Sequence, residues 1–99
     1  MVTEDFPFDS ETIVWKVAGK MFCLGNVDAF ESVNLKCNPE KALELREAFH
    51  QITPGYHMNK TLWNTVLFEG LTQIFLFELI DHSYEEVVQK LPKKVKDQL

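Results

Sequence analysis

The stretch TIVWKVAGKMFCLGNV, residues 12–27, decides the fold class. Its first half alternates, so that Ile13, Trp15 and Val17 share one side. A period of two predicts a β-strand over residues 12–18 with one well-buried face. A tight turn is expected at Gly19-Lys20, because glycine tolerates a positive φ, and residues 21–27 then predict the partner strand. Residues 12–27 therefore predict an antiparallel hairpin.

A third strand is predicted over residues 32–37, with Val33, Leu35 and Cys37 facing inward. Asn38 and Pro39 are typical of an N-cap and a first helical position, so a helix is expected through His50.

Thr53-Pro54-Gly55 is expected to end this segment, since proline cannot continue a helix. Residues 62–68 predict a fourth strand, and residues from Thr72 to the stop at Pro92 are again helical. Ser83 with Glu86 fits a capping box, which leaves open whether one helix or two abutting helices follow Thr72. The fold class expected is α+β, with an antiparallel sheet and helices.

The composition is that of one globular domain. The 99 residues are 45% hydrophobic and 12% aromatic, enough for a single core without metal or disulfide staples. Cys23 and Cys37 are expected as buried, reduced thiols. The acidic N-terminus does not resemble a secretion signal, and the apolar-rich stretch 74–80 is too short to cross a bilayer. We therefore expect a cytoplasmic protein without a membrane partner.

The net charge of −5 argues against a protein built mainly to hold phosphates. The charge is uneven, however. Residues 1–89 contain six basic and fourteen acidic side chains, whereas residues 90–99 contain four lysines and one aspartate. A short basic segment therefore stands out at the C-terminal end.

The run from Pro54 to Lys60, PGYHMNK, is followed by Trp63-Asn64-Thr65-Val66. Together with Phe6-Pro7-Phe8, with Asp81-His82-Ser83-Tyr84 and with Lys90-Leu91-Pro92, it resembles the signature of the MmcQ/YjbR family over nearly the whole chain. The resemblance implies a CyaY-like fold, an antiparallel sheet with helices packed on one face, in a single domain over residues 1–99. It also implies DNA binding through hairpin "wings".

One departure from the family pattern concerns the N-terminus. Family members usually begin with a helix of about twenty residues before the Phe-Pro-Phe segment, and here five residues precede Phe6. Apolar surface left bare by the missing helix tends to be covered by a partner, so a homo-oligomer is one expectation.

The loop that carries the resemblance supplies the candidate recognition residues. Lys60 is a candidate for phosphate contact, Asn59 and Asn64 for reading base edges or holding backbone, and Trp63 for stacking on a base. Tyr56 and His57 complete this polar group. The alternative is structural: Tyr and Trp anchor the loop through their polar tips, His57 bonds a backbone carbonyl, and Asn59 caps the turn.

Further phosphate contacts are expected from lysines outside the loop, namely Lys20, Lys36, Lys93, Lys94 and Lys96. For the C-terminal lysines the alternative is a solubilising tail that complements the last helix dipole. Two functions remain open from these residues. One is a non-enzymatic DNA-binding protein, and the other is a protein-interaction or small-ligand module that uses the sheet face or the Tyr56–Trp63 loop.

Catalytic and metal sites are not predicted. The sequence has no glycine-rich phosphate loop, nucleophile elbow or HExxH motif. His50, His57 and His82 have no carboxylate at ligand spacing, so no metal or cofactor is expected. Glu40, Glu44 and Glu47 share a helix face, a pattern typical of a solvated surface.

Overall fold

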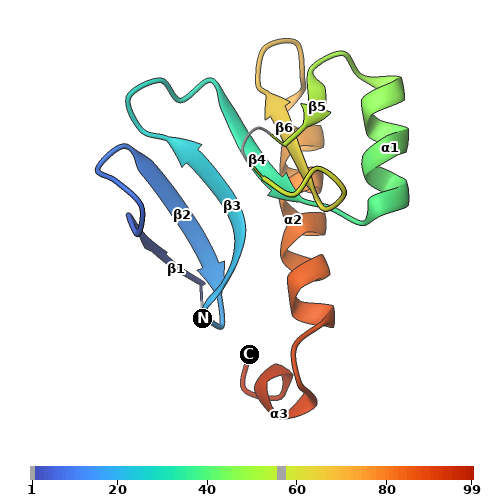
Figure 1. Cartoon of the computed structure of the whole chain (residues 1–99). Helices are drawn as coiled ribbons and strands as arrows, with labels where there is room; N and C mark the ends of the chain where they lie inside the picture. The colour runs from blue at the N-terminus through green and yellow to red at the C-terminus, as the bar shows by residue number, and fades with distance from the viewer. Residues whose placement is uncertain (1, 56–57) are drawn as a thin grey trace.

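An antiparallel sheet of six strands, in the order β1-β2-β3-β4-β6-β5, forms the centre of the molecule (Figure 1). The structure is a computed structural model that describes residues 2–55 and 58–99. The elements are β1 (Val2–Asp5), β2 (Thr12–Val17), β3 (Lys20–Asn26), β4 (Ser32–Lys36), α1 (Pro39–Ala48), β5 (Ile52–Pro54), β6 (Trp63–Leu67), α2 (Gln73–Gln89) and α3 (Lys93–Lys96). The predicted α+β class is confirmed.

The predicted hairpin is formed by β2 and β3, but its turn lies one residue earlier than expected. Ala18 and Gly19 occupy it with φ of 49° and 78°, and Lys20 already begins β3. The register shifts between Trp15 and Lys16, which pair with Cys23 and Met21. This bulge leaves Phe22 as an extra residue, so Phe22 and Cys23 both contribute to the same core cluster.

Helices α1 and α2 cover one face of the sheet, which we call the helix face. Val17, Leu35 and Val66 form its core with Leu79 and Val87 of α2. The side chains of Leu45 and Phe49 from the α1 end of the molecule pack against the same cluster, and the rings of Phe49 and Phe75 lie 4.8 Å apart. Trp15 also packs there, as its predicted face required.

The opposite face, which we call the open face, is not solvated throughout. Val14, Leu24 and Trp63 form a second buried cluster, with Met21, Met58 and Leu62 packed against it. Val14 is fully buried although the alternation assigned it to the less buried side of β2. The loop after β5 supplies the cover, because Met58 and Leu62 belong to it.

The segment after Thr72 is one helix, α2, rather than two. Ser83 lies inside it, fully buried, and its hydroxyl donates a hydrogen bond of 2.5 Å to the carbonyl oxygen of Phe22 on β3. The apparent capping serine therefore fastens the helix to the sheet. The real N-cap is Thr72, whose hydroxyl accepts from the backbone N–H of Phe75.

Three short elements were not predicted. β1 pairs with β2 along its whole length, although every residue of β1 is exposed. β5 occupies the expected breaker at Thr53-Pro54, where Pro54 ends an edge strand that pairs only with β6 among the described strands. α3 is a single turn that begins after Pro92.

Both cysteines are buried and unpaired. Burial raises the pKa of Cys23 to about 12 and also raises the pKa of Cys37, so both thiols are protonated at neutral pH. In the part of the chain described here, no helix has the length and apolar character needed to cross a membrane.

His82 connects α2 to the start of α1. Its Nε2 accepts a hydrogen bond of 3.3 Å from the backbone N–H of Asn38, the N-cap of α1. Burial, followed by the nearby charge of Lys41, lowers the pKa of His82. The neutral imidazole is therefore the form that the fold holds.

The folded pKa of His82 lies below the unfolded value of about 6.5, so the unfolded chain binds the proton more readily. Its contribution to the free energy of unfolding is fully present above that pH and is lost as the pH falls below it. We predict that His82→Gln loses less unfolding free energy than the wild type between about pH 7.5 and pH 5.5, measured by urea denaturation. Equal losses would contradict this role for His82.

Candidate nucleic-acid interface

Arg46 of α1 holds the segment between β5 and β6 through side-chain hydrogen bonds. Its Nε donates to the side-chain oxygen of Asn64 at 2.6 Å, and its Nη2 donates to the carbonyl oxygens of Trp63, at 3.2 Å, and of Lys60. A guanidinium presents several donors in one rigid plane, so one side chain can hold three acceptors. Arg46 was not among the residues predicted from the sequence.

The loop is also closed by its own hydrogen bonds. The side-chain oxygen of Asn59 accepts from the backbone N–H groups of Thr61 and Leu62, at 2.9 and 3.3 Å. The ammonium group of Lys60 donates to the carbonyl oxygen of Gly55 at 3.1 Å. A Cβ at Gly55 would lie 2.8 Å from the Cβ of Trp63, so the close approach of the two chains requires glycine.

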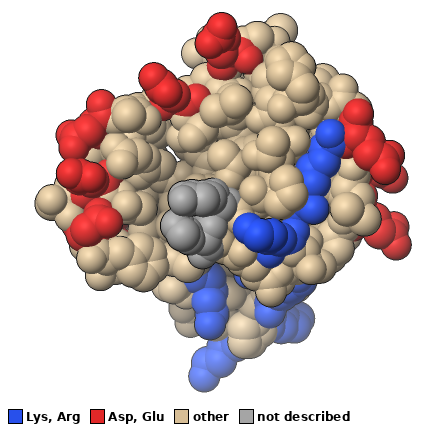
Figure 2. Space-filling view, turned by 45° about the horizontal axis from the view of Figure 1, so that its top comes forward, with Lys and Arg blue, Asp and Glu red and all other residues tan. Residues whose placement is uncertain are grey.

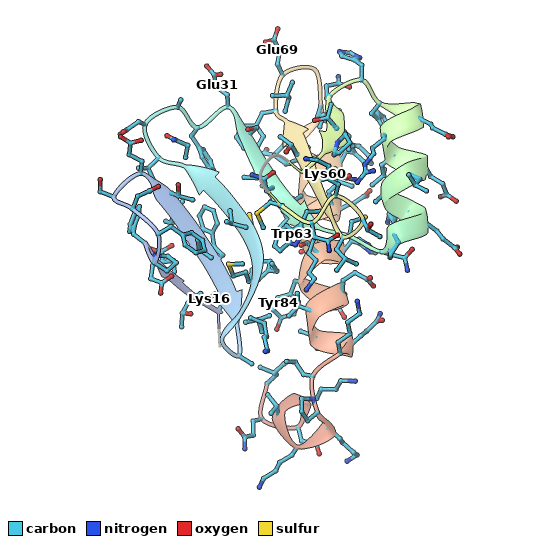
Figure 3. The ribbon with its side chains drawn as sticks, in the orientation of Figure 1. Lys16, Glu31, Lys60, Trp63, Glu69 and Tyr84 are labelled. Carbon is cyan, nitrogen blue, oxygen red and sulfur yellow. The ribbon has the colours of Figure 1, made fainter. Side chains whose placement is uncertain are left out.

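Two of the predicted recognition residues are buried. Trp63 is 5% exposed and packs in the open-face cluster, so its ring cannot stack on a base. Asn64 is 1% exposed, and its oxygen and nitrogen bond Arg46 and the carbonyl oxygen of Ala42, so it cannot read a base edge. In Figure 3, the side chain of Lys60 is drawn above that of Trp63. Asn59 caps the turn, as the structural alternative expected. Trp63 and Asn64 are buried in the fold, while Tyr56 and His57 lie outside the described residues.

Lysines from three elements meet where the hairpin turn, the end of β4 and the C-terminal end of α2 approach one another. Lys20 follows the turn, Lys36 ends β4, and Lys90 is the C-cap of α2. The Nζ of Lys36 lies 5.9 Å from the centre of the Trp63 ring. Burial, and then the charges of Lys90 and Lys20, lower the pKa of Lys36. The positive charges of Lys90 and Lys20 therefore both act on Lys36.

The predicted C-terminal lysines extend this region. Lys93, Lys94 and Lys96 are exposed on α3, which follows α2 directly, and only Lys93 among these three has a recorded ion pair, with Asp97 at 3.0 Å. We call the six lysines of this region the lysine pole: Lys20, Lys36, Lys90, Lys93, Lys94 and Lys96.

Positive and negative charges are separated on the surface. Figure 2 shows Lys and Arg side chains over the centre and lower part of one face, with Asp and Glu side chains along its upper and outer edges. Glu31 and Glu69 lie on the loops at the end opposite α3 (Figure 3). The net charge therefore conceals a basic end.

Sequence reasoning found five of the six lysines of the pole, but it did not bring them together. Lys90 was read only as part of the basic tail, because its approach to Lys36 depends on how α2 packs on the sheet. Among residues 2–55 and 58–99, no three His, Cys, Asp or Glu side chains are grouped in a way that would hold a metal ion.

Several large apolar side chains are exposed on the helix face. Phe30, Ile74 and Phe77 are 51%, 74% and 52% exposed. Phe30 and Phe77 border an apolar groove of about 280 Å³ that also includes Trp15 and Phe68. Self-association through this surface stays a prediction that light scattering in solution would test.

The hydrogen bonds of Arg46 should contribute to the stability of the fold. Arg46→Ala leaves the buried oxygen of Asn64 without its charged donor, which costs about 2–3 kcal/mol of unfolding free energy. Arg46→Lys restores only part of this, because an ammonium group cannot reproduce the guanidinium geometry. Lys41→Ala, an exposed change on the same helix, serves as the control and shifts stability by no more than about 0.5 kcal/mol. Urea denaturation showing Arg46→Ala as mild as Lys41→Ala would refute the anchoring role.

The amino-acid sequence is similar to those of two proteins of Escherichia coli. The chain is 37% identical over 91 residues to the uncharacterised protein YbdF of Escherichia coli O157:H7, covering 90% of this chain and 75% of that protein. It is 35% identical over 81 residues to the uncharacterised protein YjbR of E. coli K12, covering 80% and 69%.

Solved structures of other proteins are similar to this fold. The crystal structure of Deinococcus radiodurans protein DR2400, whose domain is described as DUF419, is similar with a TM-score of 0.92 and 37% identity, over 98% of this chain and 76% of that one. A crystal structure of a Pseudomonas syringae protein gives a TM-score of 0.70 at 26% identity, over 86% of each chain. The YjbR family model matches residues 1–86. The chain therefore belongs to the YjbR family.

Proposed function

We propose that this protein binds nucleic acid through phosphate contacts made by the lysine pole. The observation that carries the proposal is that Lys36 at the end of β4 lies within the electrostatic reach of Lys20, beside the hairpin turn, and of Lys90, at the end of α2. The pairing of β3 with β4 and the Ser83 bond from α2 to β3 bring these three segment ends together. Like charges are brought together at a cost, and an anion removes that cost when it binds between them. The lysines of α3 add further positive charge beside them.

The hairpin position of Lys20 agrees with the wing-like contact that the family resemblance implies. Lys20 is exposed directly after the Ala18-Gly19 turn, at the tip of the β2–β3 hairpin. A hairpin tip projects from the sheet, so its lysine can approach a phosphate without hindrance from neighbouring side chains.

Binding of this kind is expected to be sequence-independent and modest in affinity. Phosphate contacts fix position but carry no direct sequence information. Trp63 and Asn64, which were the candidates for base contact, are used by the fold. Affinity should fall as salt rises, because lysine–phosphate contacts release counterions, and the acidic remainder of the chain keeps the affinity modest.

The proposal assigns binding without catalysis. His82 and Ser83 are adjacent in sequence, and each makes a structural hydrogen bond, His82 with the N–H of Asn38 and Ser83 with the carbonyl oxygen of Phe22. Both cysteine thiols are held protonated by burial, which makes them poor nucleophiles.

Fluorescence anisotropy with a random-sequence duplex, between about 50 and 200 mM salt, tests the proposal. Lys20→Gln/Lys90→Gln should weaken binding and reduce the slope of log K against log[salt] by about 2, since each duplex phosphate contact contributes about 0.9. Lys60→Ala should have little effect, because the Lys60 ammonium already bonds Gly55.

The matched control is Lys16→Gln/Lys41→Gln, which changes the net charge equally at positions outside the lysine pole. It should leave the salt dependence nearly unchanged. A control as weak in binding as the pole variant, or a wild type that does not bind duplex at the lower salt, would overturn the proposal.

A further inference from the structure

A hollow of about 600 Å³ lies on the open face, between the loop that joins β1 to β2 and the loop that precedes β6. Leu24 and Gly25 of β3 form part of its floor, and Phe8 and Met58 contribute from the two loops. Its volume is within the range of pockets that hold small molecules, about 300–1,000 Å³. Among the described residues, none of those predicted from the sequence as site residues lines it.

The polar groups of the hollow offer hydrogen-bond donors. The side-chain oxygen of Asn26 already accepts from the backbone N–H groups of Asp28 and Ala29, at 2.9 and 3.0 Å. The side-chain oxygen of Asn34 accepts from the hydroxyl of Thr65 at 2.6 Å. Each amide therefore contributes chiefly its NH₂ group to a ligand, and Ser32 adds a hydroxyl.

The one acidic residue among the lining residues is committed to the fold. The Asp9 carboxylate accepts from the backbone N–H groups of Glu11 and Thr12, at 2.8 and 2.7 Å, and from the Thr12 hydroxyl. These bonds lower the pKa of Asp9. A neutral, carbonyl-rich ligand therefore meets mainly amide and hydroxyl donors in the hollow, whereas the charge of Asp9 disfavours an anion.

The apolar lining suits a flat ring. Phe8 is 64% exposed and Met58 is half-buried, so both side chains are accessible from solvent. Aromatic rings and the thioether of methionine make favourable contacts with the face or edge of a planar group. A planar heterocycle with carbonyl acceptors combines both requirements.

The hollow and one member of the lysine pole, Lys36, share one side of the sheet. Ser32, Asn34 and Lys36 are alternate residues of β4, so their side chains leave the same face. Lys36 is in the pole, whereas Ser32 and Asn34 line the hollow. A strand of nucleic acid with its phosphates at Lys36 therefore passes onto the same face that holds the hollow.

We propose that the hollow receives an unpaired nucleobase with carbonyl acceptors, of the thymine or uracil type, from a single strand whose phosphates lie at the lysine pole. This inference rests on the proposed function and adds a preference to it. A paired base is not available to the hollow, since its faces are stacked and its pairing edge is occupied.

The donors also predict which base is preferred. Recognition of adenine by asparagine uses the side-chain oxygen and nitrogen together. Here the oxygens of Asn26 and Asn34 are engaged by the protein. Carbonyl-bearing thymine should therefore bind better than adenine.

Anisotropy with labelled oligo-dT, oligo-dA of equal length and a duplex tests the inference. Asn34→Asp keeps the oxygen that Thr65 needs and removes the NH₂ donor. Asn59→Asp is the charge-matched control, because an aspartate can also accept from Thr61 and Leu62. We expect Asn34→Asp to weaken oligo-dT binding about five- to tenfold relative to Asn59→Asp, and to leave duplex binding equal in the two variants.

The outcomes separate this inference from the proposed function. Equal binding of oligo-dT and oligo-dA by the wild type, with Asn34→Asp no weaker than Asn59→Asp, overturns the role of the hollow while duplex binding stands. Absence of duplex binding overturns the proposed function, and an oligo-dT-specific loss in Asn34→Asp would still uphold the hollow.

Discussion

The contact between the Arg46 guanidinium and Asn64 is the interaction on which the rest of the surface depends. It joins α1 to β6 and, through the carbonyl oxygens of Lys60 and Trp63, holds the intervening loop against the sheet. Met58 and Leu62 of that loop then cover Val14 and Leu24. One partly buried charged donor therefore determines which polar groups of this loop remain available to a ligand.

Because of this arrangement, we assign ligand binding to the lysine pole and not to the loop before β6. In the sequence alone, a run of His, Asn, Lys and Trp resembles a recognition surface. Folded, Trp63 and Asn64 face inward and Asn59 closes a turn, so their residue types serve stability. Binding capacity then rests on the separated charges, with acidic loops at one end and the lysine pole at the other (Figures 2 and 3).

Local signals in the sequence predicted much of the fold. The alternation placed Trp15 and Val17 on the helix face correctly, and Asn38 and Pro39 marked the start of α1. The short strand ending at Pro54 was not predicted, because its own sequence carries no strand pattern. The strand forms through its pairing with β6. Val14 was misjudged because a loop over forty residues away covers it.

The candidate site was less predictable, because it depends on contacts between distant residues. Arg46 and Asn64 are 18 positions apart, and no spacing rule relates an arginine on a helix to an asparagine on a strand. Lys36 meets Lys90 only when α2 packs along the sheet. Charged residues near in space and far in sequence leave no periodic signal, whereas amphipathic strands and capped helices do.

The central claim is that ligand contacts concentrate on the lysine pole while the loop before β6 serves the fold. Titrating isotopically labelled protein with duplex and following backbone amide shifts by NMR tests it most directly. The account predicts the largest shifts at Lys20, Lys36 and residues 90–96, with small shifts over residues 58–64. Shifts centred on residues 58–64, with the lysine pole unchanged, would contradict it.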